Sequence, residues 1–79
     1  MLNKIEYRVD LYFKYENKIT KETRYLAERP NINDYQNYFA PKLSNCYSIQ
    51  FFRFMCISES YVMLESWAKT KKRGWRRLV

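Results

Sequence analysis

The clearest pattern along the chain is an alternation of apolar and polar residues from Ile5 to Tyr15. Every second side chain is apolar or aromatic, and the positions between them are Glu6, Arg8, Asp10, Tyr12 and Lys14. A period of two predicts a β-strand with one buried face and one solvated face. A helix fits poorly, because it would carry these charges all round its surface.

A second strand is expected to return beside the first after the short polar segment 16–18. Asn17 adopts the left-handed turn conformation at low cost, which makes it the predicted turn residue. The returning strand, 19–26, runs through Ile19, Thr20, Thr23, Tyr25 and Leu26, and its outer face mixes Lys21, Glu22 and Arg24. Its charges can pair with those of the first strand across the hairpin, so we attach no function to them.

The segment after Pro30 predicts one short helix. Asn31 or Asn33 can cap it, and Asp34 would lie in its first turn, where the helix dipole favours a negative charge. Pro41 would end it after about two turns. The apolar residues at spacings of three and four form a single stripe: Ile32, Tyr35 and Phe39.

Both alternating sets of the run from Cys46 to Ile57 are largely apolar, and Gln50 and Arg53 are the clearest exceptions. A short run of this kind, rich in Phe and Ile, is typical of a central strand covered on both faces.

Residues 61–73 fit either a strand or a helix. A helix would be capped by Ser58 or Ser60 and ended by Gly74. We favour the strand slightly, because a three-residue connection from the preceding strand suits a hairpin. Residues 71–74 would then form a turn and 75–79 a final short strand.

These elements together predict an α+β fold: one domain spanning residues 1–79, with an antiparallel sheet in ββαββ order and one short helix. A chain of 79 residues buries a modest core. Association into homo-oligomers could enlarge that core, and we keep it open.

The positive charge is concentrated at one end of the chain. Six of the 15 Lys and Arg residues lie in the C-terminal element 69–79, which leaves nine basic against eight acidic residues before it. Two tryptophans flank the cluster. Clustered cations beside flat aromatic rings are typical of a surface for polyanions. The predicted binding residues are Trp67, Lys69, Lys71, Lys72, Arg73, Trp75, Arg76 and Arg77.

Other chemistry finds little support in the composition. The chain has no His and a single Gly, which removes the commonest general base and rules out glycine-rich phosphate loops. A histidine-free ribonuclease built on Tyr61, Glu65, Arg73 and Arg76 would have no identifying spacing. We therefore predict no enzyme activity, no cofactor and no metal.

The two cysteines are predicted to be buried free thiols in a reducing, cytoplasmic setting. Cys46 and Cys56 lie ten residues apart on one expected strand, about 30 Å, which is too far for a disulfide. We expect no signal peptide, no membrane span and no membrane partner, because the apolar runs are only a few residues long.

The sequence thus predicts a small, non-catalytic nucleic-acid-binding protein. RNA or another single strand is favoured, because aromatic rings stack on unpaired bases. The alternative is a protein-binding inhibitor or adaptor, of the counter-defence type that phages and mobile elements encode. It would dock its basic patch on an acidic or nucleic-acid-binding surface of its target.

Overall fold

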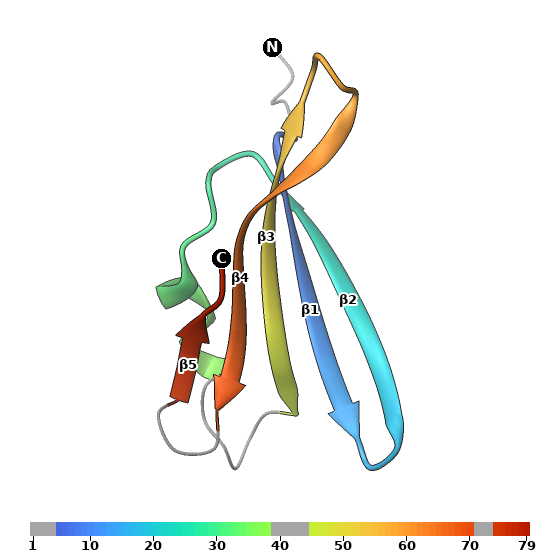
Figure 1. The fold of residues 1–79 in the computed structure, drawn as a ribbon, viewed down its shortest axis with the longest axis vertical. Helices are drawn as coiled ribbons and strands as arrows, with labels where there is room; N and C mark the ends of the chain where they lie inside the picture. Colours follow the sequence, from blue (N-terminus) through green and yellow to red (C-terminus); the bar gives the residue numbers. More distant parts are fainter. Residues whose placement is uncertain (1–4, 39–44, 71–73) are drawn as a thin grey trace.

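The protein is described by a computed structural model that covers residues 5–38, 45–70 and 74–79. Within these ranges five strands form one antiparallel sheet in the order β2-β1-β3-β4-β5 (Figure 1). A 3-10 helix, η1, follows β2 in the chain. The element bounds are β1 Tyr7–Tyr15, β2 Lys18–Leu26, η1 Ile32–Tyr38, β3 Cys46–Met55, β4 Ser60–Thr70 and β5 Gly74–Arg77.

The predicted α+β class and ββαββ order are wrong, because the expected helix is not an α-helix. The side-chain oxygen of Asn31 accepts a hydrogen bond from the Asn33 N–H at 2.9 Å, so the capping prediction is confirmed for Asn31. The turn it starts is a 3-10 helix, and at Tyr35 its backbone leaves helical geometry (φ −110°, ψ 22°). Because Tyr35 is drawn into the core, tertiary packing outweighs the weak helical preference of so short a segment. The predicted end of the helix, Phe39 to Pro41, lies outside the described residues.

The first hairpin confirms both predicted strands and corrects the turn. Tyr15 pairs with Lys18 around a two-residue loop, and β1 and β2 keep one regular register along their length. The left-handed residue is Glu16, with φ of 53°, and not Asn17. In a loop this short, the left-handed position is set by the twist of the strands that it joins.

The strands predicted in the second half of the chain are also present. β3 is the middle strand of the sheet, and residues 60–70 form strand β4, which decides between the two structures considered for 61–73 as far as Thr70. The final strand is Gly74–Arg77, shorter than the predicted 75–79. Residues 71–73, placed in the expected turn, lie outside the described ranges.

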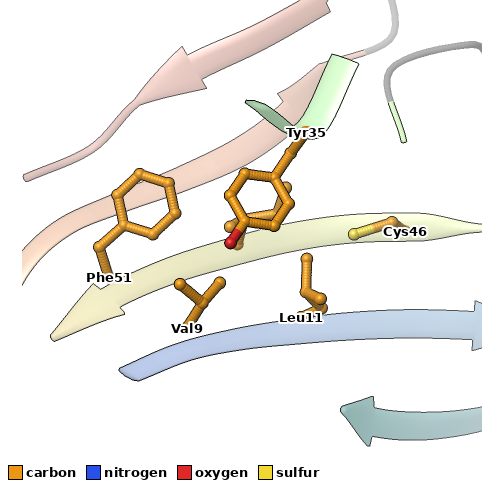
Figure 2. Close-up of a cluster of buried hydrophobic side chains, with 6 residues drawn as sticks. Val9, Leu11, Tyr35, Cys46 and Phe51 are labelled. Carbon is orange, nitrogen blue, oxygen red and sulfur yellow. The ribbon is translucent and has the colours of Figure 1, made fainter. Parts of the chain in front are cut away.

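The core lies on one face of the sheet. Val9 and Leu11 of β1 meet Ile49 and Phe51 of β3, and the ring of Tyr35 packs over them, 5.8 Å from the Phe51 ring (Figure 2). The β2–β3 connection therefore covers this face, which we call the core face. Five partly buried side chains complete it: Phe13, Leu26, Ile32, Trp67 and Trp75.

Coverage of β3 on both faces was predicted, and the described residues show it on one. Phe52 points to the other face, which we call the open face, and it is nevertheless buried. Its cover is a side chain of a neighbouring strand, since the Arg8 guanidinium carbon lies 4.2 Å from its ring centroid. A cation over an aromatic ring can thus replace a second layer of the fold.

Both cysteines are free, as predicted, but only Cys46 is buried. Cys56 is exposed because it lies in the turn after β3 and not within the strand. Burial raises the pKa of the Cys46 thiol from 9.0 to about 11. Cys46 is therefore less accessible than Cys56, and its thiol ionises less readily than an ordinary thiol.

We predict that a thiol-alkylating reagent at about pH 8 labels Cys56 in the native protein and Cys46 only after unfolding. Mass spectrometry of Cys56→Ser should show no label until denaturant is added. Rapid native labelling of Cys56→Ser would contradict the buried position of Cys46.

The pKa of the Cys46 thiol is near 9.0 in the unfolded chain and about 11 in the folded protein. Its contribution to stability is therefore present below pH 9 and lost as pH rises toward 11.

We further predict that Ile49→Val lowers the free energy of unfolding by about 1 kcal/mol, because the lost methyl group leaves a space in the core. Ile49 is fully buried, whereas Ile19 on β2 is 58% exposed. The matched change Ile19→Val should therefore stay within about 0.5 kcal/mol of the parent in urea unfolding. Equal effects at the two positions would contradict the one-sided core.

Candidate nucleic-acid interface

The two tryptophans of the predicted site belong to the core face. Trp67 and Trp75 pack against the buried cluster, Trp67 opposite Ile49 in the β3–β4 register. The Trp67 indole N–H also donates a hydrogen bond to Glu65 Oε1 at 3.1 Å. Both indole rings are thus partly buried and contribute to the packing of the core.

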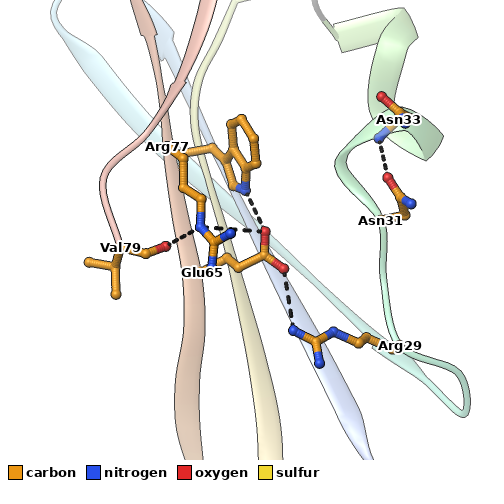
Figure 3. A network of polar contacts seen from close by, with 7 residues as sticks. Arg29, Asn31, Asn33, Glu65, Arg77 and Val79 are labelled. Atoms are coloured by element: carbon orange, nitrogen blue, oxygen red, sulfur yellow. Dashed lines mark hydrogen bonds and ion pairs between the residues drawn. The ribbon is translucent and has the colours of Figure 1, made fainter.

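Glu65 gathers three partners at the centre of this region (Figure 3). Besides the Trp67 indole, its carboxylate lies 3.9 Å from Arg77 Nε and 3.7 Å from an Arg29 guanidinium nitrogen. Arg77 Nε also donates to the Val79 carbonyl at 2.8 Å. The cluster ties the β2–β3 connection to β4 and to the C-terminal residues, and it neutralises part of the Arg77 charge.

The strand period separates the remaining predicted cations. Lys69 stands opposite Trp75 on the core face and is half-buried, whereas Arg76 stands opposite Ala68 on the open face and is exposed. Lys71, Lys72 and Arg73 lie outside the described residues. Residues that are neighbours in the sequence thus reach opposite sides of the sheet, because successive side chains of a strand alternate.

The open face carries a row of residues that crosses all five strands at one level. The register pairs Lys21 with Tyr12, Tyr12 with Ser48, Ser48 with Ala68 and Ala68 with Arg76. Four strand spacings of about 4.8 Å separate its ends, about 19 Å in all. A cation therefore stands at each edge of the sheet, an aromatic ring stands beside one of them, and two small residues lie between.

A cluster of aromatic rings surrounds Arg8 near one end of this face. The Arg8 guanidinium lies over the rings of Phe52 and Tyr61, with its carbon 4.2 and 4.9 Å from their centroids. The Tyr61 ring also meets Tyr25 at 6.1 Å and Phe54 at 5.3 Å. These rings come from β2, β3 and β4, and Arg8 of β1 lies against two of them.

A second aromatic pair lies farther along β1. Tyr12 and Tyr47 approach each other with ring centroids 6.3 Å apart. Lys21 Nζ lies 5.8 Å from the Tyr12 centroid, so this pair too has a cation beside it.

Asp10 lies between the two aromatic groups and organises their cations. Its side chain is 2% exposed, and Oδ2 lies 3.3 Å from Arg8 and 3.6 Å from Lys21. Oδ1 accepts a hydrogen bond from the Thr23 hydroxyl at 3.0 Å. Alternation along the described strands makes Asp10 the one acidic strand residue on this face, against four basic ones: Arg8, Lys14, Lys21 and Arg76.

Sequence reasoning missed the open face, although one signal for it was present. Tyr12 occupies a position in the otherwise charged set that alternates with the apolar residues of β1. One exposed ring is ordinary by itself, but several rings gathered on a solvated face mark an interaction site. The other three tyrosines, Tyr25, Tyr47 and Tyr61, gave no such signal, because their side depended on the pairing of distant strands.

The described residues contain no cluster of three or more His, Cys, Asp or Glu side chains that could hold a metal ion. Among the helices in the described ranges, none has the length and apolar character needed to cross a membrane. No protein-family model matches the chain, and neither the curated proteins nor the solved structures contain a match. Function must therefore be argued from the surface itself.

We predict that Asp10→Asn lowers the free energy of unfolding by about 2 kcal/mol, because it leaves Arg8 and Lys21 without their shared anion. The matched change Glu59→Gln removes the same charge from an exposed turn residue and should cost less than about 0.5 kcal/mol. Urea unfolding monitored by tryptophan fluorescence measures both. Equal stability of Asp10→Asn and the parent would contradict a structural role for this carboxylate.

Proposed function

We propose that this protein binds single-stranded nucleic acid, RNA in preference to duplex DNA, on the open face of its sheet and without catalysing a reaction. The observation that carries the proposal is the placement of tyrosines and cations together on that face, around one buried acidic residue. The predicted C-terminal element contributes Arg76 to the same surface. Its tryptophans act as core residues.

The tyrosines supply the contacts to bases. Tyr25 and Tyr47 are exposed, and Tyr12 and Tyr61 are half-buried beside them. Stacking of a base on an aromatic side chain is worth about 1–3 kcal/mol by alanine substitution. Unpaired bases can leave their own stack and lie on such rings, whereas the bases of a duplex present only their edges. The described residues also contain no α-helix that could enter the major groove as a recognition helix does.

The cations supply the contacts to phosphates. Lys21 and Arg76 lie at opposite ends of the row that crosses the sheet, and only the small residues Ser48 and Ala68 separate Tyr12 from Arg76. A strand of nucleic acid that followed this row would meet a positive charge at each end of it. Its affinity would fall with salt, because each neutralised phosphate releases counterions.

The polar middle of the face favours RNA. Asp10 pairs in register with Thr23 on one side and with Gln50 on the other, and Gln50 pairs with Ser66. Gln50 is half-buried and carries both a donor and an acceptor. A ribose 2′-hydroxyl can use both, which a deoxyribose cannot.

We predict that Tyr25→Ala weakens binding of a fluorescent single-stranded RNA by about tenfold, through the loss of one stacking contact. Tyr15→Ala is the matched control, because both rings are 55% exposed and Tyr15 alternates onto the core-face side of β1. Arg76→Ala and its neighbour Arg77→Ala form a second matched pair. Only Arg76→Ala should reduce the salt dependence of the affinity, by about 0.7 in the slope for one phosphate contact.

Fluorescence anisotropy at two salt concentrations measures all four variants, with a duplex DNA of equal length for comparison. Equal losses for Tyr15 and Tyr25 would place the interface elsewhere on the protein. Undetectable binding of RNA at low salt would contradict the proposed function and favour a protein target with an acidic surface.

A further inference from the structure

Strand β2 forms one edge of the sheet, where its backbone can pair with a further strand. It runs for nine residues without a bulge, and among the described strands it pairs only with β1. The opposite edge, β5, has four residues. Most side chains of β2 are exposed as well. A long and regular free edge presents unpaired backbone N–H and C=O groups, ready for another strand.

The register of the first hairpin shows which backbone groups are free. Hydrogen-bonded and non-hydrogen-bonded pairs alternate along an antiparallel ladder, and a two-residue loop is closed by a hydrogen-bonded pair. That pair is Tyr15 with Lys18, so the even-numbered residues of β2 bond to β1. The outward groups therefore belong to Ile19, Lys21, Thr23 and Tyr25.

We propose that a second copy of this chain pairs with β2 in antiparallel fashion, with the two-fold axis at Thr23. The inference goes beyond the proposed function and does not depend on it. Thr23 would exchange two backbone hydrogen bonds with Thr23 of the partner subunit. Lys21 would pair with the partner's Tyr25, and Tyr25 with the partner's Lys21. The three pairs together would form about six backbone hydrogen bonds.

Charge disfavours three of the alternative registers. A two-fold axis at Lys21, Glu22 or Arg24 would place each of these charges directly opposite its own copy, and like charges in that position are destabilising. The axis at Thr23 instead places Glu22 opposite the partner's Arg24 twice. In the single chain these two side chains already pair on the surface, with Arg24 Nε 3.1 Å from Glu22 Oε1. They can exchange partners across the axis at little cost, because both are exposed.

The lysines of β2 do not prevent this pairing, although lysines commonly protect an edge strand. In the Thr23 register Lys21 lies beside the ring of the partner's Tyr25, where a cation is favourable. Lys18 lies beyond the last residue that pairs. The sheet would become continuous over ten strands, and the two open faces would share one side, because paired residues share a face. Association would also stabilise a chain whose own core is small.

Sedimentation at about 200 µM tests the proposal through charge reversal. The parent protein should be dimeric. Glu22→Arg places two positive charges opposite each other twice, and Arg24→Glu does the same with negative charges, so each variant alone should dimerise at least about tenfold more weakly. An equimolar mixture of the two variants restores opposite charges at every such pair, and it should form a 1:1 heterodimer.

Arg53→Glu is the control, because it reverses the charge of an exposed residue on the middle strand β3. It should dimerise like the parent, and circular dichroism should show that all variants keep their strand content. A monomeric parent at this concentration would overturn the proposal. Single variants that dimerise as well as the parent, or a mixture that stays monomeric, would overturn it too.

Discussion

The burial of Val9 and Leu11 against Ile49 and Phe51, beneath the ring of Tyr35, is the interaction on which the rest of the structure depends. It uses one face of β1 and β3 together with η1, which carries Tyr35. Every other element is placed by its relation to this cluster. Because side chains alternate along a strand, committing Val9 and Leu11 to the core also commits Arg8, Asp10 and Tyr12 to the opposite face.

Among the described residues, that opposite face is stabilised without a second layer. Apolar rings left in water would be unfavourable, and a buried carboxylate without partners would cost several kcal/mol. The protein meets both needs with the same side chains. Arg8 covers Phe52 and Tyr61 with its guanidinium while it pairs with Asp10, and Lys21 pairs with Asp10 from the neighbouring strand. Cations that are already held in position lose little conformational freedom when a polyanion binds, which favours recognition.

The open face and the free edge of β2 are two consequences of the same architecture. A single sheet that is covered on one side leaves one face and, here, one long edge available. The face carries rings and cations, which suit a polyanion with flat bases, whereas the edge carries an alternating charge pattern that complements itself. The two surfaces meet at β2, where Lys21 and Tyr25 lie on the open face and beside the free edge.

Local pattern predicted most of the strands, because the alternation in β1 and the apolar run in β3 reflect burial that each strand experiences directly. The prediction of an α-helix was wrong for a related reason. Ile32 and Tyr35 do face the core, but a spacing of three fits a 3-10 turn as well as an α-helix, and packing chose between them.

The binding surface depended on longer-range structure. The tail predicted as one basic-aromatic cluster is divided between two faces, since Trp67 and Trp75 point to the core and Arg76 points away from it. Tyr25 meets Tyr61, and Tyr12 meets Tyr47, only through the pairing of distant strands. A shift of one residue in any of these registers would move a side chain to the other face. The sequence by itself thus determined the strands and the excess of positive charge, whereas the tertiary structure decided which side chains share a surface, because sidedness is a property of paired strands and not of any one segment.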